Sequence, residues 1–296
     1  MTLLTTYFNA LFPVLFCAGL GFVLARKTAW LNAPTLPTLV TNIGLPALIL
    51  NAMLNMDTAL VELSDTLIGI LLVLAFSAVL GSAVLKTGRL PVRGYLPMLV
   101  NPNTGNLGIP LVFALLGPEA LVHAVLISTV VQISHFTFGV AVLSGRFSLK
   151  ALVGNVSIIA LVAGALWQGL SLPTPAAALT TLDLLAGMAL PVMLLLLGKS
   201  IAGIDVRQLE RVGRILVLSS ARIVIGIASA ALVIWLWPMP PLVQHTLMLQ
   251  ATMPVAVLSY LLASHYEGPK DDIAAVILVS TPLSLLAILG IQAIFA

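Results

Sequence analysis

Apolar segments about as long as a membrane is thick follow one another along this chain, separated by short polar stretches. A bilayer core about 30 Å thick needs roughly 20 apolar residues for each helix that crosses it. The pattern therefore predicts an all-α integral membrane protein with ten transmembrane helices. We place these helices at about residues 6–25, 35–55, 66–86, 93–115, 120–144, 151–170, 177–198, 212–236, 241–264 and 272–295.

The composition excludes several other classes of protein. Only 8% of the 296 residues are charged and 60% are hydrophobic, whereas soluble domains carry about 25% charged residues. A soluble enzyme, a disordered regulator and a nucleic-acid binder are therefore excluded. The single cysteine, Cys17, leaves no partner for a disulfide within the chain and no cysteine cluster for a metal. No histidine pair has metal-ligand spacing, so we expect no metal and no cofactor.

The basic residues indicate the orientation in the membrane, because cytoplasmic loops carry most Lys and Arg. With the N-terminus outside, the cytoplasmic loops hold 12 of the 13 Lys and Arg residues, and the outer loops hold acidic residues instead. The thirteenth basic residue, Arg222, lies within the eighth predicted span. We expect a multi-pass protein of the bacterial cytoplasmic (inner) membrane, with both termini non-cytoplasmic and the lipid bilayer as its surroundings.

The two halves of the chain resemble each other. Residues 42–48 resemble residues 187–193 at an offset of 145, and residues 126–129 resemble residues 278–281 at an offset of 152. Each match is weak, but their common order predicts two copies of a five-helix unit. Because five is odd, the second copy enters the membrane from the opposite side, which gives the inverted repeat of many secondary transporters. The predicted repeats cover residues 1–148 and 149–296.

Proline and glycine interrupt the fourth and ninth predicted spans. The sequence NPNTGNLGIP at residues 101–110 contains Pro102 and Pro110, which remove backbone donors. The freed backbone groups need partners in protein or water, so this stretch cannot face lipid. The ninth span carries QATMP at residues 250–254, and Pro254 corresponds to Pro110 at an offset of 144. We predict that broken helices 4 and 9 cross at proline near the middle of the membrane.

Such a crossing suits an anion, because the N-terminus of a half-helix presents free N–H groups and a positive dipole end. A cation held by backbone carbonyls and amide oxygens is the alternative ligand, and asparagines that only satisfy a broken backbone are the structural alternative. The candidate substrate-binding residues are Asn103, Thr104, Asn106, Pro110, Gln250, Thr252, Pro254, Asn42 and Arg222.

Three of the polar residues have two readings each. In the first reading Arg222 attracts the substrate anion or pairs with Asp183, and in the second it anchors backbone carbonyls. His135 shares a helix face with Gln132 and is a candidate for proton coupling, or it is simply hydrogen-bonded. Asn42 either contacts substrate or caps the kink of the second span.

At residues 42–46, 102–111 and 253–254 the chain resembles the auxin efflux carrier family. This family includes the plant PIN auxin exporters and bacterial malonate-type and malate-type carriers. The resemblance covers essentially the whole chain and is most specific at residues 102–111. It implies ten helices, a five-plus-five inverted repeat and a crossing of the fourth and ninth helices at proline. It also implies an elevator motion, with a scaffold formed by spans 1, 2, 6 and 7 and a transport domain formed by spans 3–5 and 8–10.

The resemblance implies export or exchange of organic anions. We therefore expect a secondary active transporter of small carboxylates such as malonate, malate or auxin-like acids. An anion channel and a transporter-like ligand sensor are the alternatives, whereas no motif of an intramembrane enzyme is present. The absence of Asp and Glu near the two interruptions argues against sodium coupling. The apolar scaffold helices are compatible with a homodimer.

Overall fold

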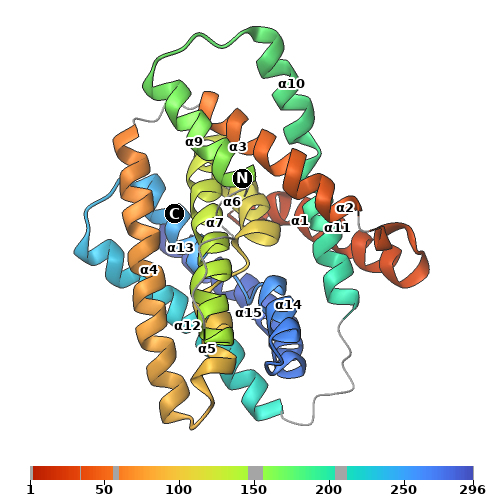
Figure 1. Ribbon diagram of the computed structural model, residues 1–296, viewed down its shortest axis with the longest axis vertical. Coiled ribbons are helices and arrows are strands. Elements are labelled where there is room, and N and C mark those ends of the chain that lie inside the picture. The colour runs from red at the N-terminus through yellow and green to blue at the C-terminus, as the bar shows by residue number, and fades with distance from the viewer. Residues whose placement is uncertain (1–2, 34, 56–59, 146–155, 204–211, 296) are drawn as a thin grey trace. The chain divides into compact units, whose positions relative to one another are not determined.

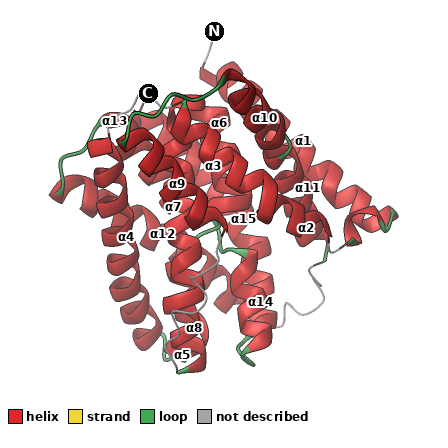
Figure 2. Ribbon diagram, turned by 45° about the horizontal axis from the view of Figure 1, so that its top comes forward, coloured by secondary structure: helices red, strands yellow, loops and turns green. Residues whose placement is uncertain are grey.

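The computed structural model describes residues 3–33, 35–55, 60–145, 156–203 and 212–295. In these residues all regular structure is helical (Figures 1 and 2), apart from an isolated antiparallel bridge between Pro102 and Val255. The predicted boundary between the two repeats, at residues 148 and 149, lies outside the described residues, and so does the predicted start of the sixth span.

Within the described residues, six helical stretches are long and apolar enough to cross a membrane, and the chain is accordingly a multi-pass membrane protein. They are Thr35–Leu54, Leu63–Thr87, Pro118–Ser144, Ala176–Ala202, Val212–Leu236 and Lys270–Ala293. The prediction of ten spans is thus met only in part, and the ten-helix inverted repeat stays a prediction. The fourth and ninth predicted spans do not add to the six, because each is divided into helices of 8 to 11 residues.

The chain forms two compact units, and each unit takes residues from both halves of the sequence. Unit 1 comprises residues 1–63, 105–129 and 153–203, and unit 2 comprises residues 64–104, 130–152 and 204–296. The boundary between Thr104 and Gly105 divides the predicted fourth span. The grouping of the spans into a scaffold and a transport domain stays a prediction.

Unit 1 is held together by close helix pairs. Its helices are α1 (Leu3–Lys27), η1 (Trp30–Asn32), α2 (Thr35–Leu39), η2 (Val40–Gly44), α3 (Leu45–Leu54), α6 (Ile109–Leu116), η4 (Pro118–Ala120), most of α7 (Leu121–Ser134), α9 (Val156–Gly169), α10 (Ala176–Gly187) and α11 (Ala189–Ala202). Helix α1 packs on α11, where a Cβ on Gly198 would overlap the carbonyl oxygen of Ala18. Small residues at this contact let the two backbones approach, as is usual in membranes.

Unit 2 contains the long helices α4 (Leu60–Thr87, from Ser64 onward), α12 (Val212–Leu236) and α15 (Lys270–Phe295). Its shorter helices are α5 (Val92–Val100), the end of α7, η5 (His135–Gly139), α8 (Val140–Ser144), α13 (Pro241–Ala251) and α14 (Val257–His265). Helix α12 packs against α5, α13 and α15. It therefore lies at the centre of the contacts that position the two interrupted helices.

Helix ends follow from local sequence. Pro110 and Pro241 lie in the first turns of α6 and α13, where a missing N–H costs nothing. Helix α8 ends at Gly145, whose φ of 74° is left-handed and favours glycine. Asp271 and Asp272 occupy the first turn of α15, where negative charge complements the helix dipole.

Candidate functional site

Two helices of unit 2 stop short of a membrane crossing. Helix α5 ends at Val100, and the chain runs without helix through residues 101–103. Helix α13 ends at Ala251, and α14 begins only at Val257. Both interruptions are buried and contain proline, so their backbone groups need partners inside the protein.

The two interruptions lie against each other. Pro102 and Val255 form the antiparallel bridge, and the N–H of Asn103 donates to the carbonyl oxygen of Pro254 at 2.8 Å. Pro102 has no N–H, so its place in the bridge leaves no donor unsatisfied. The proline that meets the second interruption is therefore Pro102. Pro110, which corresponds to Pro254 in the predicted repeat, is the second residue of α6.

Arg222 joins the ends of both interrupted helices. It has the largest side chain among the fully buried residues of the described part of the chain. Its Nη1 donates to the carbonyl oxygen of Leu99, and its Nη2 donates to that of Ala251, the latter at 2.6 Å. These bonds agree with the predicted backbone anchor. Whether Arg222 also contacts substrate stays a prediction.

Hydroxyl groups of α15 support the second interruption. The Ser284 hydroxyl donates to the carbonyl oxygen of Thr252 at 2.7 Å, and the N–H of Val255 donates to the Ser280 hydroxyl at 3.2 Å. Neither serine was predicted from the sequence. Ser280 lies in the repeated segment 278–281, which could have drawn attention to it, whereas an isolated serine such as Ser284 in an apolar helix carries no pattern.

The first interruption carries amide side chains. Asn101 is fully buried; its Nδ2 donates to the carbonyl oxygen of Pro97 at 3.2 Å, and its Oδ1 has no hydrogen-bond partner among the described residues. Asn103 is 5% exposed and uses its backbone N–H, but not its side chain, in the bonds seen among the described residues. The N–H of Thr104 donates to the carbonyl oxygen of Pro102 at 2.9 Å. The first interruption therefore keeps polar groups that the fold itself does not use.

Two further predicted residues lie at the second interruption. Gln250 is fully buried in the last turn of α13. Thr252 follows that helix, and its hydroxyl donates to the carbonyl oxygen of Met248 at 2.8 Å. The Thr252 hydroxyl thus turns back onto its own helix end, which limits what it can offer to a ligand.

His135 lies in unit 2 at the start of η5 and is 1% exposed. Its Nδ1 lies 3.2 Å from the carbonyl oxygen of Val131, and its Nε2 lies 3.2 Å from the hydroxyl of Ser259. Because a carbonyl oxygen can only accept, Nδ1 carries a proton, and in the neutral ring Nε2 accepts from the serine. Both ring nitrogens are engaged, as in the hydrogen-bonded alternative, and proton coupling stays a prediction.

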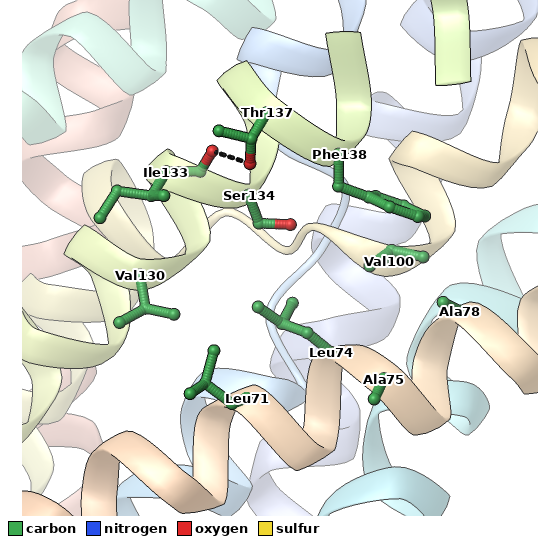
Figure 3. Close-up of a pocket in the computed structure, with 10 residues that line it drawn as sticks. All are labelled: Leu71, Leu74, Ala75, Ala78, Val100, Val130, Ile133, Ser134, Thr137 and Phe138. Carbon is green, nitrogen blue, oxygen red and sulfur yellow. Dashed lines mark hydrogen bonds between the residues drawn. The ribbon is translucent and has the colours of Figure 1, made fainter. Parts of the chain in front are cut away.

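An apolar cavity of about 290 Å³ lies beside the first interruption within unit 2 (Figure 3). It is lined by Leu71, Leu74, Ala75, Ala78, Val100, Val130, Ile133, Ser134, Thr137 and Phe138. Val100 directly precedes Asn101 in the sequence, but neither Asn101 nor Asn103 is among the residues that line the cavity. The Thr137 hydroxyl donates to the carbonyl oxygen of Ile133 at 2.7 Å, as the dashed line shows. The cavity can hold a hydrocarbon group and offers no charge.

The remaining predicted residues belong to unit 1. Asn106 is half-buried in η3 (Thr104–Gly108), and Pro110 is buried in α6. Asn42 is exposed in η2 and lines an open depression of about 440 Å³. Asp183 accepts a hydrogen bond of 2.7 Å from Nδ2 of Asn51. Roles of Asn42, Asn106 and Pro110 in substrate binding stay predictions.

Comparison with known proteins gives the family. The chain matches the family described as membrane transport protein over residues 6–148 and 140–292, which together span almost its whole length. The chain belongs to this family, the auxin efflux carrier family. It is also 25% identical over 271 residues to an uncharacterized transporter of Methanothermobacter thermautotrophicus, a match that covers 87% of each chain.

Membership of the auxin efflux carrier family makes the chain a membrane transporter, and the family is not one of enzymes. Among the described residues, no group of three or more His, Cys, Asp or Glu side chains could hold a metal ion.

Proposed function

We propose that this protein is a secondary active transporter of organic anions, which it binds at the meeting point of the two interrupted helices. The observation that carries the proposal is the contact of the two interruptions through Pro102, Asn103, Pro254 and Val255. Transporters commonly place substrate between broken helices whose N-terminal ends face anionic groups. Helix α14 begins at Val257 without a side-chain cap; the N–H of Ser259 donates to the carbonyl oxygen of Ala256, and the N–H groups of Val257 and Leu258 face such a ligand in our proposal.

The contacts of unit 2 support an inverted five-helix repeat. In such a repeat, corresponding residues near the pseudo-two-fold axis contact each other. The hydroxyl of Ser77 on α4 donates to that of Ser229 on α12 at 3.1 Å, and these serines are 152 positions apart. Pro102 and Val255 are 153 positions apart. Residues 126–129 and 278–281 resemble each other at the same offset of 152. The contacts and the sequence therefore support the same inverted repeat.

The substrate proposed is a carboxylate with a hydrocarbon part. The buried amides of Asn101 and Asn103 supply neutral polar groups for the carboxylate. The cavity beside Val100 offers about 290 Å³ for an apolar group. Malonate, malate and auxin-like acids all fit the carboxylate requirement, and the apolar cavity makes aromatic and aliphatic acids the first to test.

We further propose that movement follows an elevator-type alternating access, with spans 3–5 and 8–10 as the transport domain. The proposed location is the bacterial inner membrane, with non-cytoplasmic termini and, in the membrane, a homodimer. Two repeats with similar sequences and opposite orientation can exchange small conformational differences, which produces the two access states.

Counterflow in proteoliposomes tests the proposal. Vesicles loaded with an unlabelled carboxylate should accumulate the labelled acid transiently, and the initial rate should saturate with concentration. Asn103→Ala should lose this uptake, whereas Asn32→Ala, a change of the same kind in η1 of unit 1, should keep it. Flux without saturation or trans-stimulation would identify a channel instead. Saturable binding without flux would identify a ligand sensor.

A further inference from the structure

Arg222 neutralises two helix C-termini with one side chain. Its two terminal nitrogens donate to the carbonyl oxygens of Leu99, in the last turn of α5, and of Ala251, the last residue of α13. Each helix C-terminus carries about −0.5 elementary charge. The two ends together therefore carry about one negative charge, which one buried guanidinium balances.

Arg222 has no charged counterpart at the equivalent position of the first repeat. Leu99 and Ala251 are 152 positions apart, the separation that also relates Ser77 to Ser229. The two carbonyls are thus equivalent under the proposed symmetry, and the fork of the guanidinium spans both. The residue equivalent to Arg222 at this offset is Ile70, which is fully buried and apolar. One cation therefore serves both repeats.

Helix α12 has a glycine that admits this contact. Gly226 lies one turn after Arg222, and a Cβ at this position would overlap the carbonyl oxygen of Ala251 and approach Nη2 of Arg222. The close approach of α12 to the end of α13 therefore depends on the missing side chain. Arg222 and Gly226 together form the contact surface of α12 for the C-terminal end of α13.

No carboxylate accompanies this charge in the segments that surround it. Residues 92–104, 212–236 and 241–256 contain no Asp or Glu. The partners of the two terminal nitrogens are backbone carbonyls, and Nε has no hydrogen-bond partner among the described residues. Among the described residues, the bonds of Arg222 thus run to the carbonyl ends of two helices and not to an acidic side chain.

We propose that Arg222 is a built-in cation, which takes the place that a coupling sodium ion takes in transporters with crossed broken helices. In those proteins the unwound carbonyls and the half-helix C-terminal ends coordinate the ion. Here the equivalent carbonyls are already bound by a fixed guanidinium, so the crossing is stable without sodium. Arg222 acts through the two helix ends, and it is a positioning residue for the ligand site.

Thermal unfolding of the purified protein tests this proposal. Wild type should have the same melting temperature in sodium, potassium and choline chloride at equal ionic strength. Arg222→Gln, which keeps the length but removes the charge, should melt lower and should regain stability in a saturable way with sodium or with millimolar guanidinium. Arg222→Lys should melt below wild type but without a response to cations.

Arg214→Gln is the matched control, because Arg214 lies on the same helix and pairs with Asp272 near the surface. It should show no cation-specific gain. A sodium-specific rise for wild type would overturn the proposal, and so would an Arg222→Gln protein that melts like wild type or gains nothing from any cation. If Arg222→Gln cannot be purified, Arg222→Ala extracted with and without guanidinium decides: equal yields contradict the proposal.

The consequence for transport rests on the proposed function, and a separate measurement keeps the two apart. Carboxylate uptake by wild-type proteoliposomes should be equal in sodium and in choline. Uptake that requires sodium would overturn the built-in cation. A complete lack of carboxylate uptake would overturn the transport proposal, while the melting comparison would still decide the role of Arg222.

Discussion

The two interruptions of unit 2 meet at one point but are held in different ways. At the second interruption, hydroxyls from α15 bond to the backbone of Thr252 and Val255, and the Thr252 hydroxyl returns to its own helix. At the first interruption, Asn101 and Asn103 bring buried amide groups that the described protein groups leave partly unused. The two copies therefore differ in how their backbones are held: hydroxyls of α15 bond to the second interruption, whereas buried asparagines lie in the first.

This difference assigns different tasks to the two copies. Buried polar groups without partners are costly, so a fold retains them where a ligand or water satisfies them. A braced backbone contributes stability and a fixed position. We infer that the second interruption mainly supports the crossing and that the first mainly binds the substrate.

The largest effect should come from removing the close approach that braces the second interruption. In Gly226→Ala, the new Cβ overlaps the carbonyl oxygen of Ala251, and overpacking of this kind costs about 1–3 kcal/mol or more. The melting temperature should fall clearly. Gly213→Ala is the control on the same helix, because a Cβ there meets nothing within 4 Å. Equal melting temperatures of the two variants would contradict the tight contact of α12 with α13.

A smaller loss of stability should follow when one brace is removed. Ser284→Ala leaves the buried carbonyl of Thr252 without its hydroxyl donor, and an unsatisfied buried group costs about 1–3 kcal/mol. Chemical or thermal unfolding of the purified protein measures the change. Thr281→Val serves as control, because that hydroxyl bonds only to the carbonyl of Ile277 in its own helix. If both variants unfold alike, Ser284 does not brace the interruption.

The contrast between the copies is sharpest in ligand affinity. Asn103→Ala should weaken carboxylate binding about tenfold or more, which corresponds to about 1.4 kcal/mol, with little change in the melting temperature of the free protein. Thr252→Val should lower the melting temperature and change the carboxylate affinity little, because the Thr252 hydroxyl is bonded to the carbonyl oxygen of Met248. Equilibrium binding of a labelled acid distinguishes them. Loss of affinity in Thr252→Val alone would reverse our assignment.

The smallest effect should come from a change remote from both interruptions. Asp272 accepts from the Tyr95 hydroxyl and lies 3.3 Å from Nη1 of Arg214, at a partly exposed position. Asp272→Asn keeps an acceptor for Tyr95, removes a screened charge pair, and leaves Asp271 as the negative charge in the first turn of α15. Carboxylate uptake and melting temperature should stay within the scatter of replicate measurements. A loss of uptake would show that this cluster takes part in transport.

Proline, glycine and asparagine in an apolar segment are conspicuous in a sequence, because they have few physical explanations there. Residues 101–110 and Pro254 stand out for this reason, and the family resemblance predicted from them is confirmed. The correspondence of Pro110 with Pro254 in the repeat stays a prediction, and the bridge itself lies at Pro102 and Val255. A proline in the first turn of a helix looks the same in sequence as one that breaks it.

Apart from Ser280, which lies in the repeated segment 278–281, the supporting residues were beyond sequence reasoning. Ser280 and Ser284 are ordinary residues of an apolar helix, and Gly226 becomes informative only when the end of α13 is placed beside it. Arg222 was recognised as exceptional, but its two carbonyl partners lie 123 and 29 positions away. Only the fold brings such distant groups together, so these two bonds could not be predicted from the sequence, and contact of Arg222 with substrate stays a prediction.

The measurement that tests the account most directly is the melting temperature of wild type with a panel of carboxylates. A ligand that binds only the folded state adds about 2.7 kcal/mol of stability at 100 times its Kd. We predict that one class of aromatic or aliphatic carboxylates raises the melting temperature, equally in sodium and in choline, and that Asn103→Ala abolishes the rise. A rise with neutral or cationic ligands and with no carboxylate would contradict the account.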